Sequence, residues 1–276
     1  MRFKHPDHIL YERVGNVAHI VLNRPEKLNA ITEEMKFLLV ERFRQADRDP
    51  EAHCIVLRGE GRSFCAGHDI GNDQDEEDEA EPTALGWHNH LDGTVKSETA
   101  PWEARKPVIA QVQGHAVGGG CQLAMCCDLV IAADNAKFGE PEIRFSTAGP
   151  VFVLPWIIGQ RRAREMVYFG DIVDAATALD YGMVNRVVAA ERLAEEVRKY
   201  SERLALYSPE SLVAAKRALN RGMEADGFRN AINAGHDVIS SLYATETALS
   251  REFYAISERD GLKAALAWRK DRFAPK

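Results

Sequence analysis

The chain has 276 residues, 45% of them hydrophobic, which is enough to bury one large core with or without a smaller appendage. No apolar run approaches the roughly 18 residues of a membrane span, and the N-terminus lacks the apolar stretch of a signal peptide. The five cysteines are odd in number and lack CxxC spacing, which argues against a disulfide framework and against a zinc site. We therefore expect a cytoplasmic globular protein with no metal site and no membrane partner.

The net charge of −7 is concentrated in one segment, Asn72–Glu81, which holds seven acidic residues and no basic one. The remainder of the chain is balanced and shows no basic stripe for a phosphate backbone, so we expect no nucleic-acid partner. Because like charges repel, the acidic run is predicted to be a solvated loop. A lid beside the functional site is the alternative.

Short apolar runs alternate with helical patterns in the first two thirds of the chain. Residues 17–22, 53–57, 108–112 and 129–133 are predicted strands. Thr32 is a predicted N-cap for a helix that runs to about Asp49, and Cys121–Cys127 is a second helical stretch. This alternation indicates an α/β layered fold.

The C-terminal third shows helical patterns and no convincing strand. Ser208-Pro209 is a typical helix start, and Gly227 precedes a helix whose buried face is predicted to include Phe228, Ile232, Val238, Ile239 and Leu242. We therefore divide the chain into a core of residues 1–190 and a helical region of residues 191–276. Such a region is expected to cover a site or join subunits.

Three glycines, Gly118-Gly119-Gly120, stand between a predicted strand and a predicted helix. Glycine lets another molecule approach the main chain closely, and the first N–H groups of a helix have no partner within it. The spacing fits neither a dinucleotide fingerprint nor a P-loop. The cluster therefore indicates a place for a permanent or developing negative charge, with a tight strand–helix turn as the alternative.

Two further segments complete the candidate site. Ser63–Ile70 leaves a predicted strand through Ala66 and Gly67, so the N–H groups of Ala66 and Gly119 are predicted to hold one oxygen together as an oxyanion hole. In the segment FGEPE, Glu142 is a candidate general acid or base. A purely structural carboxylate is the alternative for Glu142.

These segments resemble the crotonase (enoyl-CoA hydratase/isomerase) family. The resemblance is carried by NRPEKLNAI at Asn23–Ile31, FCAGHDI at Phe64–Ile70, GHAVGGGCQLAMCCDLVIA, AKFGEPEI, DAATALDYGMVNRVV and the ending ERDGLKAALAWRKDRF, in family order over nearly the whole chain. It implies a crotonase-like spiral of ββα units with a C-terminal helical region, assembled as a homotrimer or a dimer of trimers. It also implies an acyl-CoA substrate and no separate cofactor, because CoA is part of the substrate.

The resemblance further implies that Ala66 and Gly119 donate their N–H groups to the thioester carbonyl oxygen, and that Glu142 moves a proton beside it. The substrate-binding residues that it implies are Lys27, Leu28, Ala30, Ala66, Gly67, His68, Asp69, Ile70 and Gly118.

The chain departs from the family at Gln122, where typical hydratases carry a second glutamate. A glutamine amide can hold a water molecule but cannot accept its proton. Hydration and double-bond isomerisation of an enoyl-CoA are therefore both expected activities. The alternatives are a thioester or carbon–carbon hydrolase that depends on His68, and a non-catalytic acyl-CoA binder.

Overall fold

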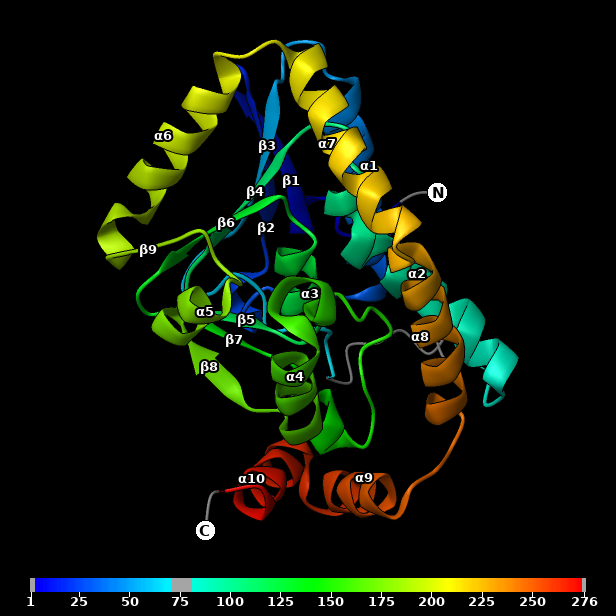
Figure 1. Cartoon of the computed structure of the whole chain (residues 1–276). Coiled ribbons are helices and arrows are strands. Elements are labelled where there is room, and N and C mark those ends of the chain that lie inside the picture. The colour runs from blue at the N-terminus through cyan, green and yellow to red at the C-terminus, as the bar shows by residue number, and fades with distance from the viewer. Residues whose placement is uncertain (1–2, 71–80, 275–276) are drawn as a thin grey trace.

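The computed structural model describes residues 3–70 and 81–274 and is a mixed α/β structure (Figure 1). Its larger sheet has six strands in the order β1-β2-β3-β4-β6-β9, with β1 antiparallel to β2 and every other neighbouring pair parallel. These strands are β1 (Ile9–Val14), β2 (Val17–Leu22), β3 (Cys54–Gly59), β4 (Val108–Val112), β6 (Leu129–Ala133) and β9 (Arg186–Val188). The acidic run predicted as a loop lies outside the described residues except for Glu81.

Helices cover both faces of this sheet, because successive side chains of a strand point to opposite faces. In β3, Ile55 and Leu57 pack in the main core against α1 (Glu33–Arg48), whereas Cys54 and Val56 pack against α6 (Leu193–Ala205) on the other face. Figure 1 shows α6 on one side of the sheet, with α1 and α2 (Ala84–Glu103) on the other. Strands buried on both faces explain why the sequence reads as continuous apolar runs there.

A smaller sheet positions the functional residues. It has the order β5-β7-β8, with β5 (His115–Val117) parallel to β7 (Lys137–Gly139) and β7 antiparallel to β8 (Ile172–Asp174). Helix α3 (Gly119–Met125) begins two residues after β5, and the 3-10 helix η4 (Pro141–Phe145) begins two residues after β7. Since parallel neighbours end at the same edge, the glycine cluster and the FGEPE segment meet there.

The predicted strands at 17–22, 53–57, 108–112 and 129–133 are confirmed as β2, β3, β4 and β6. The predicted cap of α1 is also confirmed, because the Met35 N–H donates to Thr32 Oγ1 at 3.3 Å. Among the described residues the fold matches the crotonase-like architecture implied by the resemblance, with strands and helices alternating up to β9.

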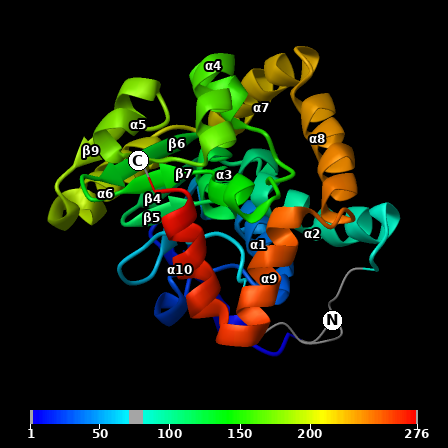
Figure 2. The same ribbon diagram turned by 90° about the horizontal axis from the view of Figure 1, so that it is seen from below.

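Helices follow β9: α6, α7 (Pro209–Ala225), α8 (Phe228–Tyr243), α9 (Ala248–Asp260) and α10 (Leu262–Arg272). Figure 2 shows α9 and α10 side by side. Helix α6 packs on the large sheet, so the division at residue 190 marks a change of secondary structure rather than a break in packing. In residues 3–70 and 81–274, no helix combines the length and the apolar character of a membrane-spanning segment.

The predicted burial of one α8 residue is wrong. Val238 is 66% exposed, whereas Phe228, Ile232 and Ile239 are buried as predicted. At about 100° per residue these three lie on one face of the helix, and Val238 points away from it. Its apolar type alone suggested burial.

Two further helices lie between η4 and β9 in the chain. They are α4 (Leu154–Phe169), which leads from the loop after η4 towards β8, and α5 (Ala175–Tyr181), which leads towards β9. The 3-10 helices η1 (Pro6–His8), η2 (Pro25–Lys27) and η5 (Ala190–Arg192) form short turns.

Candidate active site

Three segments far apart in the sequence meet at one edge of the small sheet. Cys65 forms a parallel bridge with Ala116, and Gly118 N–H donates to the Gly139 carbonyl at 2.8 Å. The chain leaving Cys65, the chain entering α3 and the chain leaving β7 therefore lie together. The structure thus brings together the oxyanion segments and the FGEPE segment singled out in the sequence.

The glycines at this edge allow two carboxyl groups to approach the main chain. A Cβ atom on Gly118 would lie 2.6 Å from Glu142 Oε1, and one on Gly119 would lie 2.7 Å from Glu98 Oε1. Gly118 also has φ +58° and ψ −132°, a conformation open to glycine alone. Because Gly118 and Gly119 have no side chains, the carboxyl groups of Glu142 and Glu98 can contact two successive residues of the main chain.

The backbone amide predicted at Ala66 is already engaged. Ala66 N–H donates to the Leu28 carbonyl at 3.0 Å, so it is not available to an incoming oxygen. Gly67 O and Asp69 N–H pair with Ile31, which turns the intervening His68 N–H to the opposite side. Among the described residues neither His68 N–H nor Gly119 N–H has an acceptor. The expectation that the Ala66 N–H is free to bind an oxygen is therefore wrong, and the N–H groups of His68 and Gly119 are the ones left without an acceptor in this part of the structure.

The predicted CoA-binding segments lie side by side. The bonds of Ala66 and Gly67 to the 28–31 loop bring Lys27, Leu28 and Ala30 next to Ala66–Asp69, with Ile70 exposed at the end. This loop contains left-handed backbone at Leu28 (φ 53°) and Asn29 (φ 58°). Asp69 accepts a bond from the buried Arg24 guanidinium at 2.5 Å.

Asn29 is a supporting residue that sequence reasoning did not single out. Its buried side chain accepts from Arg24 N–H and donates to the carbonyl oxygens of Glu60 and Ser63. These bonds join the 24–30 loop to the segment that leads into the site. An asparagine tolerates left-handed backbone, which was the available signal.

Glu142, Glu140 and Gln122 converge on one point. A Cβ atom on Gly149 would lie 3.9 Å from Gln122 Nε2, from Glu140 Oε2 and from Glu142 Oε1. Burial raises the pKa of Glu142 to about 7. Burial also raises the pKa of Glu140 well above its usual range, and the charge of Glu142 raises it further. Glu140 was not among the predicted site residues.

His68 and Glu98 form a buried pair on the other side of the glycine turn. His68 Nε2 lies 2.8 Å from Glu98 Oε1. Burial raises the pKa of Glu98 to about 8 and lowers the pKa of His68, with the charge of Lys36 lowering it further. At neutral pH the pair is therefore uncharged, and the Glu98 carboxylic acid donates to the imidazole.

The walls around Glu142 are apolar and aromatic. Phe152, Ala148, Ile143 and Val167 line a cavity together with Glu140 and Glu142. Phe152 belongs to a cluster with Tyr243 of α8, whose ring packs on Trp87 of α2 at 4.9 Å. The helical C-terminal part of the chain thus contributes side chains to the surroundings of the site.

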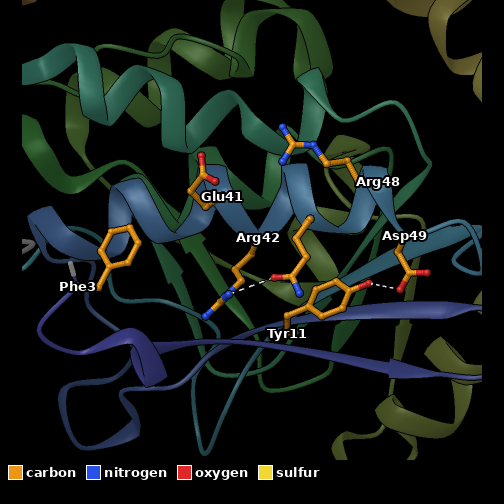
Figure 3. A pocket seen from close by; sticks show the side chains of 7 residues that line it. Phe3, Tyr11, Glu41, Arg42, Arg48 and Asp49 are labelled. Carbon is orange, nitrogen blue, oxygen red and sulfur yellow. Dashed lines mark hydrogen bonds between the residues drawn. The ribbon is translucent and has the colours of Figure 1, made fainter. Parts of the chain in front are cut away.

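A larger hollow lies elsewhere, between α1 and β1 (Figure 3). Its volume is about 480 Å³. The Tyr11 hydroxyl donates a hydrogen bond to Asp49 Oδ2 at 2.6 Å, and Figure 3 shows this pair among the lining side chains. None of the predicted site residues lines it. Its size therefore does not make it the candidate active site.

Comparison with known proteins identifies the family of this chain. A family model described as enoyl-CoA hydratase/isomerase matches residues 12–259. The chain belongs to the enoyl-CoA hydratase/isomerase family. It is 36% identical to a probable enoyl-CoA hydratase of Rhizobium meliloti (96% of this chain, 97% of the relative) and 33% identical to a crotonyl-CoA hydratase of Syntrophomonas wolfei (98% and 99%).

The chain is also similar to a solved structure and to a relative named for a different substrate. A crystal structure of an enoyl-CoA hydratase/isomerase from Xanthobacter autotrophicus Py2 superposes with a TM-score of 0.91 at 34% identity, covering 97% of this chain and 98% of that one. The (E)-benzylidenesuccinyl-CoA hydratase of Thauera aromatica is 35% identical over 78% of this chain and 83% of its own length. The fold and the enzyme class expected from the sequence are therefore confirmed.

Proposed function

We propose that this enzyme moves a proton at the carbon next to the thioester carbonyl of an enoyl-CoA, with hydration or a shift of the double bond as the outcome. The observation that carries the proposal is the position of Glu142. Its carboxyl group lies over Gly118, the residue before Gly119, and the Gly119 N–H has no acceptor in the described part of the chain. A base next to an anion-stabilising donor suits chemistry that passes through an enolate.

In the proposed reaction the thioester oxygen accepts hydrogen bonds from His68 N–H and Gly119 N–H. Charge gathers on that oxygen when a nucleophile adds to C3 or when a proton leaves the acyl chain. Fixed donors stabilise this charge most in the transition state, and removal of one such donor typically costs about 10²–10³ in rate. Glu142 exchanges the proton at the adjacent carbon.

The pKa of Glu142 suits this task. A catalytic acid or base works best when its pKa is close to the working pH, and burial brings the pKa of Glu142 to about 7. The CoA moiety is proposed to lie along Lys27–Ala30 and Ala66–Ile70. The names of the relatives, which act on crotonyl-CoA and benzylidenesuccinyl-CoA, support an enoyl-CoA substrate with either an aliphatic or an aromatic acyl group.

Incubation with 2-enoyl-CoA and 3-enoyl-CoA thioesters, followed by mass spectrometry, tests this proposal. Wild-type enzyme should add one water or interconvert the thioesters at unchanged mass. Glu142→Gln should lower turnover by about 10²–10⁴-fold, because the amide cannot carry the proton. Binding of a saturated acyl-CoA, measured by calorimetry, should be retained.

Glu202→Gln is the matched control, since Glu202 is exposed on α6 and pairs only with Arg198 among the described residues. It should leave turnover unchanged. Release of free CoA without either product would show a hydrolase instead. Binding without turnover of any thioester would show a non-catalytic binder.

A further inference from the structure

The FGEPE segment contains a second buried carboxyl group, Glu140, which the proton transfer above does not use. Its side chain is only 4% exposed, and its Oε1 atom has no hydrogen-bond partner in the described part of the chain. Glu140 also makes no ion pair there. The side chains of Gln122 and Cys121 interact with this carboxyl group and lower its pKa, which leaves Oε1 as the oxygen without a partner. A buried, unpaired carboxyl oxygen typically costs about 1–3 kcal/mol, so Oε1 is free to accept a further donor.

The carboxyl groups of Glu140 and Glu142 border the same small space. Both carboxyl groups have an oxygen 3.9 Å from the same point above Gly149, so these oxygens lie within twice that distance of each other. Both also line the same cavity of about 10 Å³, walled otherwise by apolar side chains and the backbone of Gly149. A cavity of this size has room for the centre of about one water molecule.

The charges of the two groups depend on each other. Burial raises the pKa of both, and the charge of Glu142 raises the pKa of Glu140 in addition. Two carboxyl groups that cannot both ionise share one proton at neutral pH. One member is then a base and the other an acid at the same time.

We propose that Glu140 is the second carboxyl group of hydration, in place of the glutamate that Gln122 replaces, and that it holds the reacting water together with Glu142. This inference rests on the proposed function and narrows it to hydration of a 2-enoyl thioester. Gln122 lies at the same point above Gly149, and its amide orients the water without taking its proton.

The step balances with the one proton that the pair holds. The step starts from the form of the pair in which the shared proton lies on Glu142 and Glu140 is ionised. The water oxygen bonds to C3, the electrons of the C2=C3 double bond move onto the thioester oxygen, and one water proton passes to the Glu140 carboxylate. The enolate then reforms the carbonyl as C2 takes the proton of Glu142. The product gains one water, and the pair again holds one proton.

The test separates hydration, which needs both carboxyl groups, from exchange of the C2 proton, which needs Glu142 alone. Hydration of a 2-enoyl-CoA and incorporation of deuterium at C2 of a saturated acyl-CoA are measured for wild type and Glu140→Gln, with unfolding curves to show that the variant is folded. We expect hydration to fall by about 10²-fold or more, and exchange to fall by less than about 10-fold. In Glu140→Gln, the added change Gln122→Glu should restore part of the hydration.

Retention of hydration within about threefold in Glu140→Gln would overturn the inference, as would an equal loss of hydration and exchange, which marks a structural role. In either case a strong loss of both reactions in Glu142→Gln leaves the proposed function intact. Carbon-13 NMR of labelled glutamate carboxyl groups tests the pair without any substrate. Glu142→Gln should lower the pKa of the Glu140 carboxyl, and an unchanged pKa would overturn the shared proton even if no enoyl-CoA is turned over.

Discussion

Two buried carboxyl groups lie on successive glycines of this enzyme, and their surroundings differ. Glu98 reaches Gly119 from α2 and is hydrogen-bonded to His68 at 2.8 Å. Glu142 reaches Gly118 from η4. Its neighbour is the second carboxyl group, Glu140, whose pKa is raised by the charge of Glu142. The pKa of each is raised by burial, to about 8 for Glu98 and about 7 for Glu142.

The difference shows how one edge of a sheet supports two tasks. A protonated carboxyl group with a fixed partner is stable and holds its neighbour in place, which suits Glu98 as a positioning residue for the His68 segment. Glu142 has one carboxyl oxygen, Oε2, with no hydrogen-bond partner among the described residues, which leaves it open to bind water or to take a substrate proton. The predictions below distinguish the Glu98–His68 side of the glycine turn from the Glu142–Glu140 side, beginning with the largest expected effect.

Gly119→Ala should disturb the donor that lies between the two sides. The added Cβ would meet His68 Nε2 at 2.6 Å and Glu98 Oε1 at 2.7 Å, so either the pair or the Gly119 N–H has to move. We expect turnover to fall by about 10²–10³-fold, as for loss of an oxyanion donor. In a His68→Ala background, which removes the contact with the imidazole and releases Glu98 from its partner, the same change should cost less. Equal losses in both backgrounds would show that the clash is not the cause.

Glu98→Gln should change the pH dependence of stability. The pKa of Glu98 is about 8 in the folded enzyme, against 4.5 for an ordinary glutamate, so between these values the folded state holds a proton that the unfolded state has released. The contribution of the protonated group is therefore complete below about pH 4.5 and is lost as the pH rises towards 8, by up to about 1.4 kcal/mol per pH unit. Urea unfolding from pH 5 to 8 should show a flatter dependence for the glutamine variant; parallel curves would contradict the raised pKa.

Cys121→Ser should produce the smallest change, a shift in the pH profile of hydration through the Glu140 carboxyl group. The fully buried Cys121 thiol acts on the Glu140 carboxyl to lower its pKa, against the larger effect of burial. A hydroxyl is a stronger donor than a thiol and favours the ionised carboxylate more. The pH profile of hydration should shift to lower pH by less than about one unit. A shift to higher pH would show that the side chain at 121 does not reach Glu140.

The sequence predicted the carboxyl ends of the central strands well, because β2, β4 and β6 are apolar runs that end in turn residues. It did not predict α2, in which Gly86, Gly93 and Pro101 interrupt the helical pattern. That omission also hid Glu98, since the residue reaches the site only through the packing of α2 on α3. Tertiary packing, not local preference, makes this helix.

The candidate site was predicted in its segments and less well in its atoms. Alternate amides of an extended segment point to opposite sides, so a sequence cannot show which of Ala66 and His68 has a free N–H. Pairing with Leu28 and Ile31 engages the Ala66 N–H and leaves the His68 N–H without an acceptor among the described residues. Glu140 and Glu142 are both glutamates of one motif. Only the structure shows that both side chains line the same cavity.

The most direct measurement compares turnover of one enoyl-CoA thioester by Glu142→Gln and by Glu98→Gln at neutral pH. Both variants replace a buried carboxyl group on the glycine turn with an amide of the same shape. The account predicts a loss of about 10² or more for Glu142→Gln and less than about 10-fold for Glu98→Gln. A larger loss at Glu98 than at Glu142 would contradict it and place the proton transfer on the His68 side.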